Sequence, residues 1–122
     1  MSHWFYTAIL APILLFQGKR VRATTPRLPE PNGAREANID NARANILILG
    51  DSSAAGVGAS HQSKALSGQI LSGINDVSVC WRLEAQTGAK TADGIARVEQ
   101  LAHRHYDWVV TVFGVNDVTA NI

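Results

Sequence analysis

The sequence predicts one α/β domain, a three-layer αβα fold around a parallel sheet, of which this chain holds an incomplete part with the strand order 2-1-3. Apolar runs at 46–49 and 109–113 are nearly continuous, as in central parallel strands covered on both faces. Between these runs, apolar residues recur at helical spacing in two segments and alternate with polar ones in a third. A chain of 122 residues is about one domain long.

Composition and charge exclude several classes of protein. With 46% hydrophobic and 17% charged residues, the chain is neither disordered nor a multi-span membrane protein. Residues 1–43 hold six Lys or Arg against three acids, whereas residues 44–122 hold five against seven. A slightly acidic folded part excludes nucleic acid as the partner. Cys80 is the only cysteine, so we expect no intrachain disulfide and no thiolate metal cluster.

Residues 1–23 form an apolar and basic leader. Residues 4–16 carry no charge and are followed by Lys19, Arg20 and Arg22. The run is shorter than the roughly 20 residues that span a bilayer, and Pro12 lies in its middle. Two interpretations stay open: peripheral contact of residues 4–16 with a membrane interface, at a cell envelope or membrane, or packing on the domain's own surface, which fits a cytoplasmic protein.

Residues 24–44 are predicted to be a linker, because three prolines, a glycine and mixed charges occur there without periodicity. The folded part, residues 45–122, begins with the strand at 46–49. A helix follows, because Leu66, Ile70 and Ile74 are spaced by four. Residues 77–83 then alternate between apolar and polar side chains, which predicts a strand with one face in solvent.

The second helix is predicted from Ile95, Val98 and Ala102, and the strand at 109–113 completes the pattern. If the alternating strand lies at the edge, right-handed crossovers place the first strand between the other two. The crossovers then leave the first and third strands in opposite directions, which creates the switch point where open α/β sheets bind ligands. We expect Ser52 and the 114–117 segment to meet there.

Three motifs follow the three predicted strands. They are Gly50-Asp51-Ser52 with Gly56, then Gly88, then Gly114 with Asn116 and Asp117. In this order and spacing, over residues 45–119, the chain resembles the amino-terminal part of SGNH (GDSL-type) serine hydrolases, which are esterases and lipases. The resemblance implies a flavodoxin-like sheet and hydrolysis of a small-molecule or lipid ester through an acyl-enzyme, without metal or cofactor.

The resemblance also implies residue roles. Ser52 is the nucleophile, and the backbone N–H groups of Ser52 and Gly88 with the Asn116 side-chain amide form the oxyanion hole. Asp51 and Asp117 have the positions of residues that brace the loops, although each could instead be a loop or helix cap. Gly56 and Gly58 allow the backbone to turn beside the site.

None of the four histidines is expected to be the catalytic base. His3 lies in the leader, His61 at the start of the first helix, and His103 and His105 near the end of the second. The family's base belongs to a later Asp-x-x-His block that does not occur here. We therefore expect residues 1–122 to be the amino-terminal part of a longer hydrolase and to be inactive alone.

A second function is compatible with the same loop. A strand, a glycine-rich turn and a helix also build phosphate-binding sites, so a flavodoxin-like phosphate- or nucleotide-binding module without hydrolase activity is the alternative. Residues 56–61 lack the third glycine of the dinucleotide fingerprint, and no Gly-Lys-Ser/Thr follows. The hydrolase substrate stays open among a short acyl ester, a lysophospholipid, a thioester and an acetylated sugar.

Overall fold

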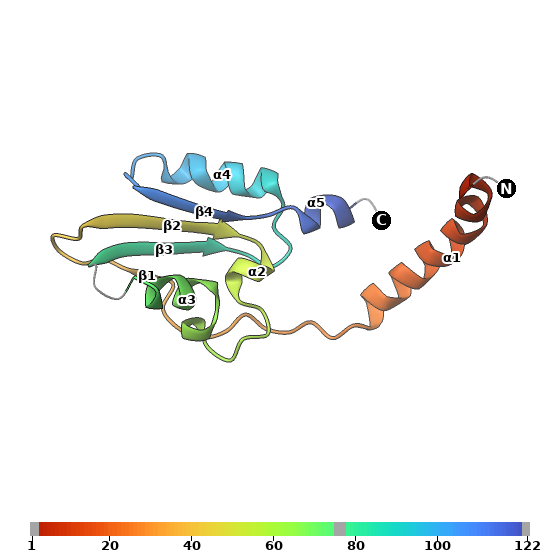
Figure 1. The fold of residues 1–122 in the computed structure, drawn as a ribbon, viewed down its shortest axis with the longest axis horizontal. Coiled ribbons are helices and arrows are strands. Elements are labelled where there is room, and N and C mark those ends of the chain that lie inside the picture. The colour runs from red at the N-terminus through yellow and green to blue at the C-terminus, as the bar shows by residue number, and fades with distance from the viewer. Residues whose placement is uncertain (1–2, 75–77, 121–122) are drawn as a thin grey trace.

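Strand β2 (Ala44–Gly50) is central in the sheet of the computed structural model, which describes residues 3–74 and 78–120. It pairs in parallel with β3 (Val79–Ala85) on one side and with β4 (Trp108–Val112) on the other (Figure 1). The α/β class predicted from the sequence is therefore confirmed. Residues 1–2 of the predicted leader and 121–122 of the predicted domain lie outside the described residues.

The strand order differs from the prediction. The sheet has four strands in the order β1-β3-β2-β4 and is mixed, so the whole sheet is not the parallel 2-1-3 arrangement that was predicted. Within it, the strand at 46–49 does lie between the other two predicted strands. The added strand, β1 (Glu36–Ala37), pairs antiparallel with β3, placing Glu36 opposite Arg82. These two side chains also form an ion pair of 3.4 Å. β1 lies inside the expected linker and pairs with the outer edge of β3, so the alternating strand is not the edge strand that the sequence predicts.

Helices lie on both faces of the sheet. One face carries Ile46, Ile48 and Leu83, packed against α2 (Ser52–Ala55) and α3 (Leu66–Ser72). Leu47 and Leu49 face the other way and pack with Leu101 of α4 (Thr91–Leu101). Figure 1 shows α4 on one side of the sheet and α2 and α3 on the other. Because β2 is buried on both faces, each of its core positions needs an apolar side chain, which explains the continuous run.

The two predicted helices differ in how well their apolar positions are buried. Ile70 and Ile74 pack against the core, after the short 3₁₀ helix η1 (Gln62–Lys64) that precedes α3. In α4, by contrast, Ile95 is 59% exposed and Val98 44% exposed. The apolar spacing therefore predicted the helix, but two of the residues that gave the spacing are exposed, and the buried residues of α4 are Gly94 and Leu101. The predicted strand start at Val77 lies outside the described residues.

Helix α1 (His3–Thr24) projects away from the sheet (Figure 1). None of its residues in the described range is buried, so it is not packed on the domain's surface, which was one of the two expectations. A hydrogen bond from Arg22 Nη2 to Thr119 O, 2.8 Å long, links it to α5 (Val115–Thr119). Among the described helices, none has the length and apolar character needed to cross a membrane.

Candidate active site

The loops that follow the three parallel strands are joined by backbone hydrogen bonds. Asp51 N–H, just after β2, donates to Val112 O at the end of β4 (3.0 Å). Gln86 N–H, just after β3, donates to Gly50 O (3.1 Å). These bonds continue the pairing one residue past the end of β2 on each side. The three predicted motifs therefore follow the carboxyl ends of the three parallel strands, at the same end of the sheet.

Ser52 is the first residue of α2 and is half-buried. The preceding Asp51 is buried and caps this helix, because its Oδ1 accepts a hydrogen bond from Ser53 N–H (2.9 Å). The capping interpretation of Asp51 is therefore confirmed. Among the described residues, none makes a hydrogen bond to the Ser52 hydroxyl.

Gly56 ends α2 with a left-handed backbone, at φ +84°. A Cβ there would lie 2.4 Å from the Ala65 Cβ, so both the conformation and the space require glycine. The buried Gln62 side chain donates from Nε2 to Ala55 O (2.8 Å) and accepts from Ser67 Oγ (3.2 Å). Sequence reasoning missed Gln62. Its role depends on the folded position of η1, for which the local pattern carries no signal.

Gly88 lies in the exposed loop after β3 and has φ +83°. No atom lies within 4 Å of the position of a Cβ, so only the backbone conformation selects glycine here. The neighbouring Ala89 carbonyl accepts a hydrogen bond from Asn116 Nδ2 (3.0 Å). Asn116 therefore holds the loop that contains Gly88.

Asp117 braces the start of α4. Its carboxylate accepts hydrogen bonds from Thr91 Oγ1 (2.8 Å) and Thr91 N–H (3.1 Å). Thr91 is the first residue of α4, so Asp117 binds an N–H group that the helix itself leaves unpaired. Together, Asn116 and Asp117 tie α5 to the segment between Gly88 and α4.

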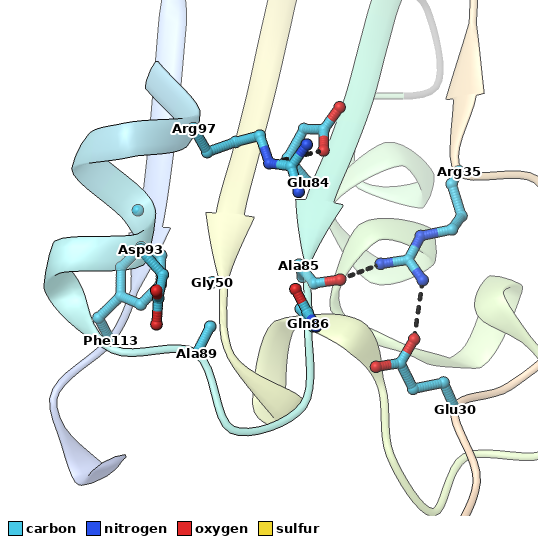
Figure 2. A pocket seen from close by; sticks show the side chains of 11 residues that line it. Glu30, Arg35, Gly50, Glu84, Ala85, Gln86, Ala89, Asp93, Arg97 and Phe113 are labelled. Atoms are coloured by element: carbon cyan, nitrogen blue, oxygen red, sulfur yellow. Dashed lines mark hydrogen bonds and ion pairs between the residues drawn. The ribbon is translucent and has the colours of Figure 1, made fainter. Parts of the chain in front are cut away.

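Two residues of the expected linker, Glu30 and Arg35, also hold the loop after β3, and we call this pair the Glu30 clamp. Glu30 Oε1 accepts hydrogen bonds from Thr87 N–H (3.0 Å) and Thr87 Oγ1 (2.8 Å). Glu30 Oε2 pairs with Arg35 Nη1 at 2.9 Å, and Arg35 Nη2 donates to Ala85 O (Figure 2). Sequence reasoning missed both residues, because their partners lie some fifty residues away in the chain.

The electrostatics of Glu30 reflect this clamp. Partial burial by itself raises the pKa of the Glu30 carboxyl, but the hydrogen bonds from Thr87 and the Arg35 guanidinium outweigh it. The pKa therefore lies below its ordinary value of 4.5. The clamp is charged, and intact, at neutral pH.

A charged cleft of about 280 Å³ opens beside these loops (Figure 2). Glu84 on β3 pairs there with Arg82 and, at 3.5 Å, with Arg97 of α4. The residues that line the cleft include Glu30, Arg35, Glu84, Asp93, Arg97 and Phe113. The lining also includes Gly50 and Ala89 but not Ser52, Gly88 or Asn116, so this cleft does not contain the candidate nucleophile or the predicted side-chain donor.

Two of the described histidines have hydrogen-bond partners other than Ser52. The His61 imidazole accepts a hydrogen bond from Ser63 N–H (3.2 Å) and lies 2.9 Å from Ser63 Oγ. His105 Nε2 lies 3.1 Å from Asp107 Oδ1. No histidine in the part of the chain described here bonds to Ser52, and no three His, Cys, Asp or Glu residues of that part are grouped to hold a metal ion.

Comparisons with protein-family models, with curated proteins and with solved structures found no match to this chain. The candidate site therefore depends on the arrangement of its own residues.

Proposed function

We propose that this chain carries the nucleophile and oxyanion hole of a serine ester hydrolase of the SGNH type, and that its sheet is part of a larger flavodoxin-like fold. The observation that carries the proposal is the linked set of loops after β2, β3 and β4. The Asp51–Val112 and Gln86–Gly50 backbone bonds and the Asn116–Ala89 bond join them.

The proposed oxyanion hole uses three donors. Ser52 N–H and Gly88 N–H donate to no residue in the described part of the chain, as a waiting oxyanion hole requires. Asn116 Nδ2 carries two hydrogens, and its bond to Ala89 O uses one of them. The second hydrogen is the proposed third donor.

In the proposed reaction, Ser52 Oγ attacks the ester carbonyl carbon while a general base takes the hydroxyl proton. The carbonyl π electrons move to the oxygen, which the three donors stabilise. Collapse of this intermediate breaks the bond to the alcohol, which leaves with the proton from the base. Water then hydrolyses the acyl-Ser52 by the same steps. We propose that the base lies outside residues 1–122.

The phosphate-binding alternative has less support. A bound phosphate needs free N–H groups and positive charge at the start of a helix. At α2, the buried Asp51 carboxylate already accepts the Ser53 N–H bond. At α4, Asp117 accepts from Thr91 N–H, and Asp93 accepts from Lys90 N–H (2.8 Å). The Ser53, Thr91 and Lys90 N–H groups, which a phosphate at these two helix starts would bind, are therefore already occupied.

A fluorophosphonate probe tests the proposal on the protein extended beyond residue 122. We expect one label on Ser52 in the unmodified protein and none in Ser52→Ala. The matched control is Ser53→Ala, because Ser53 is the adjacent, exposed serine and binds Asp51 only through its backbone. It should label normally.

A folded, extended protein that takes no label, or takes it on another residue, would refute the proposal. Thermal stabilisation by inorganic phosphate without labelling would instead favour the binding module.

A further inference from the structure

Helix α1 exposes an unusual amount of apolar surface. Trp4 is 83% exposed, Phe16 68% and Leu14 60%. The other large apolar side chains exposed on this helix are Phe5, Tyr6, Ile9, Leu10, Ile13, Leu15 and Val21. A patch of this extent on a soluble domain indicates a binding surface.

The apolar side chains surround the helix axis. Ile13, Leu14, Leu15 and Phe16 are consecutive, and consecutive helical residues point about 100° apart. Contact with a flat protein surface would therefore leave much of this surface in water. The same distribution argues against a helix lying in the membrane plane, which needs a polar face.

The one aliphatic hydroxyl within residues 4–16 has its hydrogen bond satisfied inside the helix. Thr7 Oγ1 donates to His3 O at 2.9 Å. This bond removes the main cost of placing a hydroxyl in a hydrocarbon medium.

Positive charge follows the apolar run directly. Lys19, Arg20, Arg22 and Arg27 come before the first acidic residue, Glu30. Such a basic cluster beside an apolar helix is complementary to anionic lipid headgroups. Arg22 also donates to Thr119 O, so the basic end of α1 is the end that meets the folded part.

Length decides how deep the helix can reach. Residues 4–16 extend about 20 Å at 1.5 Å per residue, less than the ~30 Å hydrocarbon core of a bilayer. We propose that α1 is a membrane anchor that inserts end-on, without crossing, into an anionic membrane. Residues 4–16 lie among the acyl chains, and Lys19, Arg20 and Arg27 lie at the lipid phosphates. This anchoring is independent of the hydrolase chemistry.

Flotation with vesicles of equimolar phosphatidylcholine and phosphatidylglycerol tests the anchor on the unmodified chain. We expect the chain to float with the vesicles and Leu14→Asp to lower the partition coefficient about 100-fold, from the cost of a carboxylate in the membrane. Ile95→Asp is the matched control, because Ile95 is also 59% exposed but lies on α4, outside the proposed anchor and its basic cluster. It should float like the unmodified chain.

Two further measurements separate insertion from surface adsorption. Lys19→Gln with Arg20→Gln should weaken binding to these vesicles about tenfold or more, but not binding to pure phosphatidylcholine. Lipids brominated on the acyl chains should quench the tryptophan fluorescence of the unmodified chain in part. This quenching should be lost in Trp4→Phe, because Trp4 is the tryptophan that enters the membrane.

Three results would overturn the proposal. They are failure of the unmodified chain to float, equal loss of binding in Leu14→Asp and Ile95→Asp, and a stable oligomer by sedimentation that does not bind vesicles. The last result would refute the anchor, and an oligomer that persists in Val109→Lys but dissociates in Leu14→Asp would assign α1 to contact with a second copy of the chain.

Discussion

Asn116 has two roles in the proposed site, because its side-chain amide carries two N–H groups. One holds the Gly88 loop through Ala89 O, and the other is the proposed oxyanion donor. Asp117, the next residue, holds α4 through Thr91. Neighbouring residues thus position the loop and the helix that follows it.

At this scale, we expect Asn116→Ala in the extended protein to lower turnover by about 10² to 10³, the usual effect of losing one oxyanion donor. Fluorophosphonate labelling of Ser52 should remain, although slower, because the nucleophile is unchanged. Steady-state hydrolysis of an activated short-chain ester measures the effect. Normal turnover in this variant would exclude Asn116 from the oxyanion hole.

The lowered pKa of Glu30 leads to a prediction about stability at acidic pH. Its pKa lies below 4.5 in the folded state, so its charged clamp stabilises the fold above pH 4.5 and loses this contribution as the pH falls through the folded-state value. Glu30→Gln keeps an acceptor for Thr87 but does not titrate. The difference in free energy of unfolding between the two proteins should be constant near neutral pH. Below pH 4.5 the unmodified protein should lose stability relative to Glu30→Gln, because only its clamp is protonated.

Denaturant titrations at several pH values measure this difference. The pKa of Asp107 is also lowered, by hydrogen bonds from Asn45 N–H and from His105. Because Asp107 is present in both proteins, subtracting the two curves removes its contribution. A difference that does not change with pH would show that Glu30 does not titrate as a member of the clamp.

Among the elements, β4 has the least support. It is at one end of the strand order, and no described strand pairs with its outer edge. Trp108 is 68% exposed and Val109 52% exposed. An unpaired strand edge with exposed apolar side chains promotes association between chains.

Residues 1–122 alone should therefore self-associate or aggregate, and Val109→Lys should weaken the self-association about tenfold or more, because edge pairing would desolvate the lysine. Val118→Lys makes the same charge change at a 72% exposed valine of α5 and should have little effect. Sedimentation at several concentrations compares them. Since α1 is identical in both variants, its own contribution cancels. A monodisperse monomer would contradict the prediction.

For the whole molecule, nearly continuous apolar runs predicted where two of the strands lie. Only β2 is buried on both faces as predicted, whereas β4, which was also expected to be a covered central strand, lies at the end of the sheet and has no buried residue. The run at 46–49 lies within β2, and the run at 109–113 overlaps β4. These patterns are local, because burial on two faces demands apolar side chains in succession. The α/β class followed from them.

The rest depends on contacts between distant residues. β1 has only Glu36 and Ala37, and it exists through pairing with β3. Glu30 holds Thr87, which is 57 residues away. Prolines and mixed charge around these residues indicated a linker, and no local pattern could indicate the partners. Ile95 and Val98 of α4 followed the helical period but remain largely exposed.

The purified 122-residue chain should show no ester hydrolysis that depends on Ser52, because no described residue bonds to its hydroxyl to take the proton. His61 is the nearest histidine in sequence, but its ring bonds Ser63. Hydrolysis of an activated ester by the chain, by Ser52→Ala and by His61→Ala should be equal. Activity lost in both variants would identify His61 as the base.

The double-sided pairing of β2 has a consequence for hydrogen exchange. Its N–H groups from Ile46 to Gly50 point alternately toward β3 and β4, so all of them are protected until the sheet as a whole opens. In β4, every second N–H faces the unpaired edge and should exchange in local fluctuations. Ser52 therefore follows the most slowly exchanging segment of the sheet, while Asn116 follows the fastest of the three parallel strands, and amide exchange followed by NMR should resolve the two.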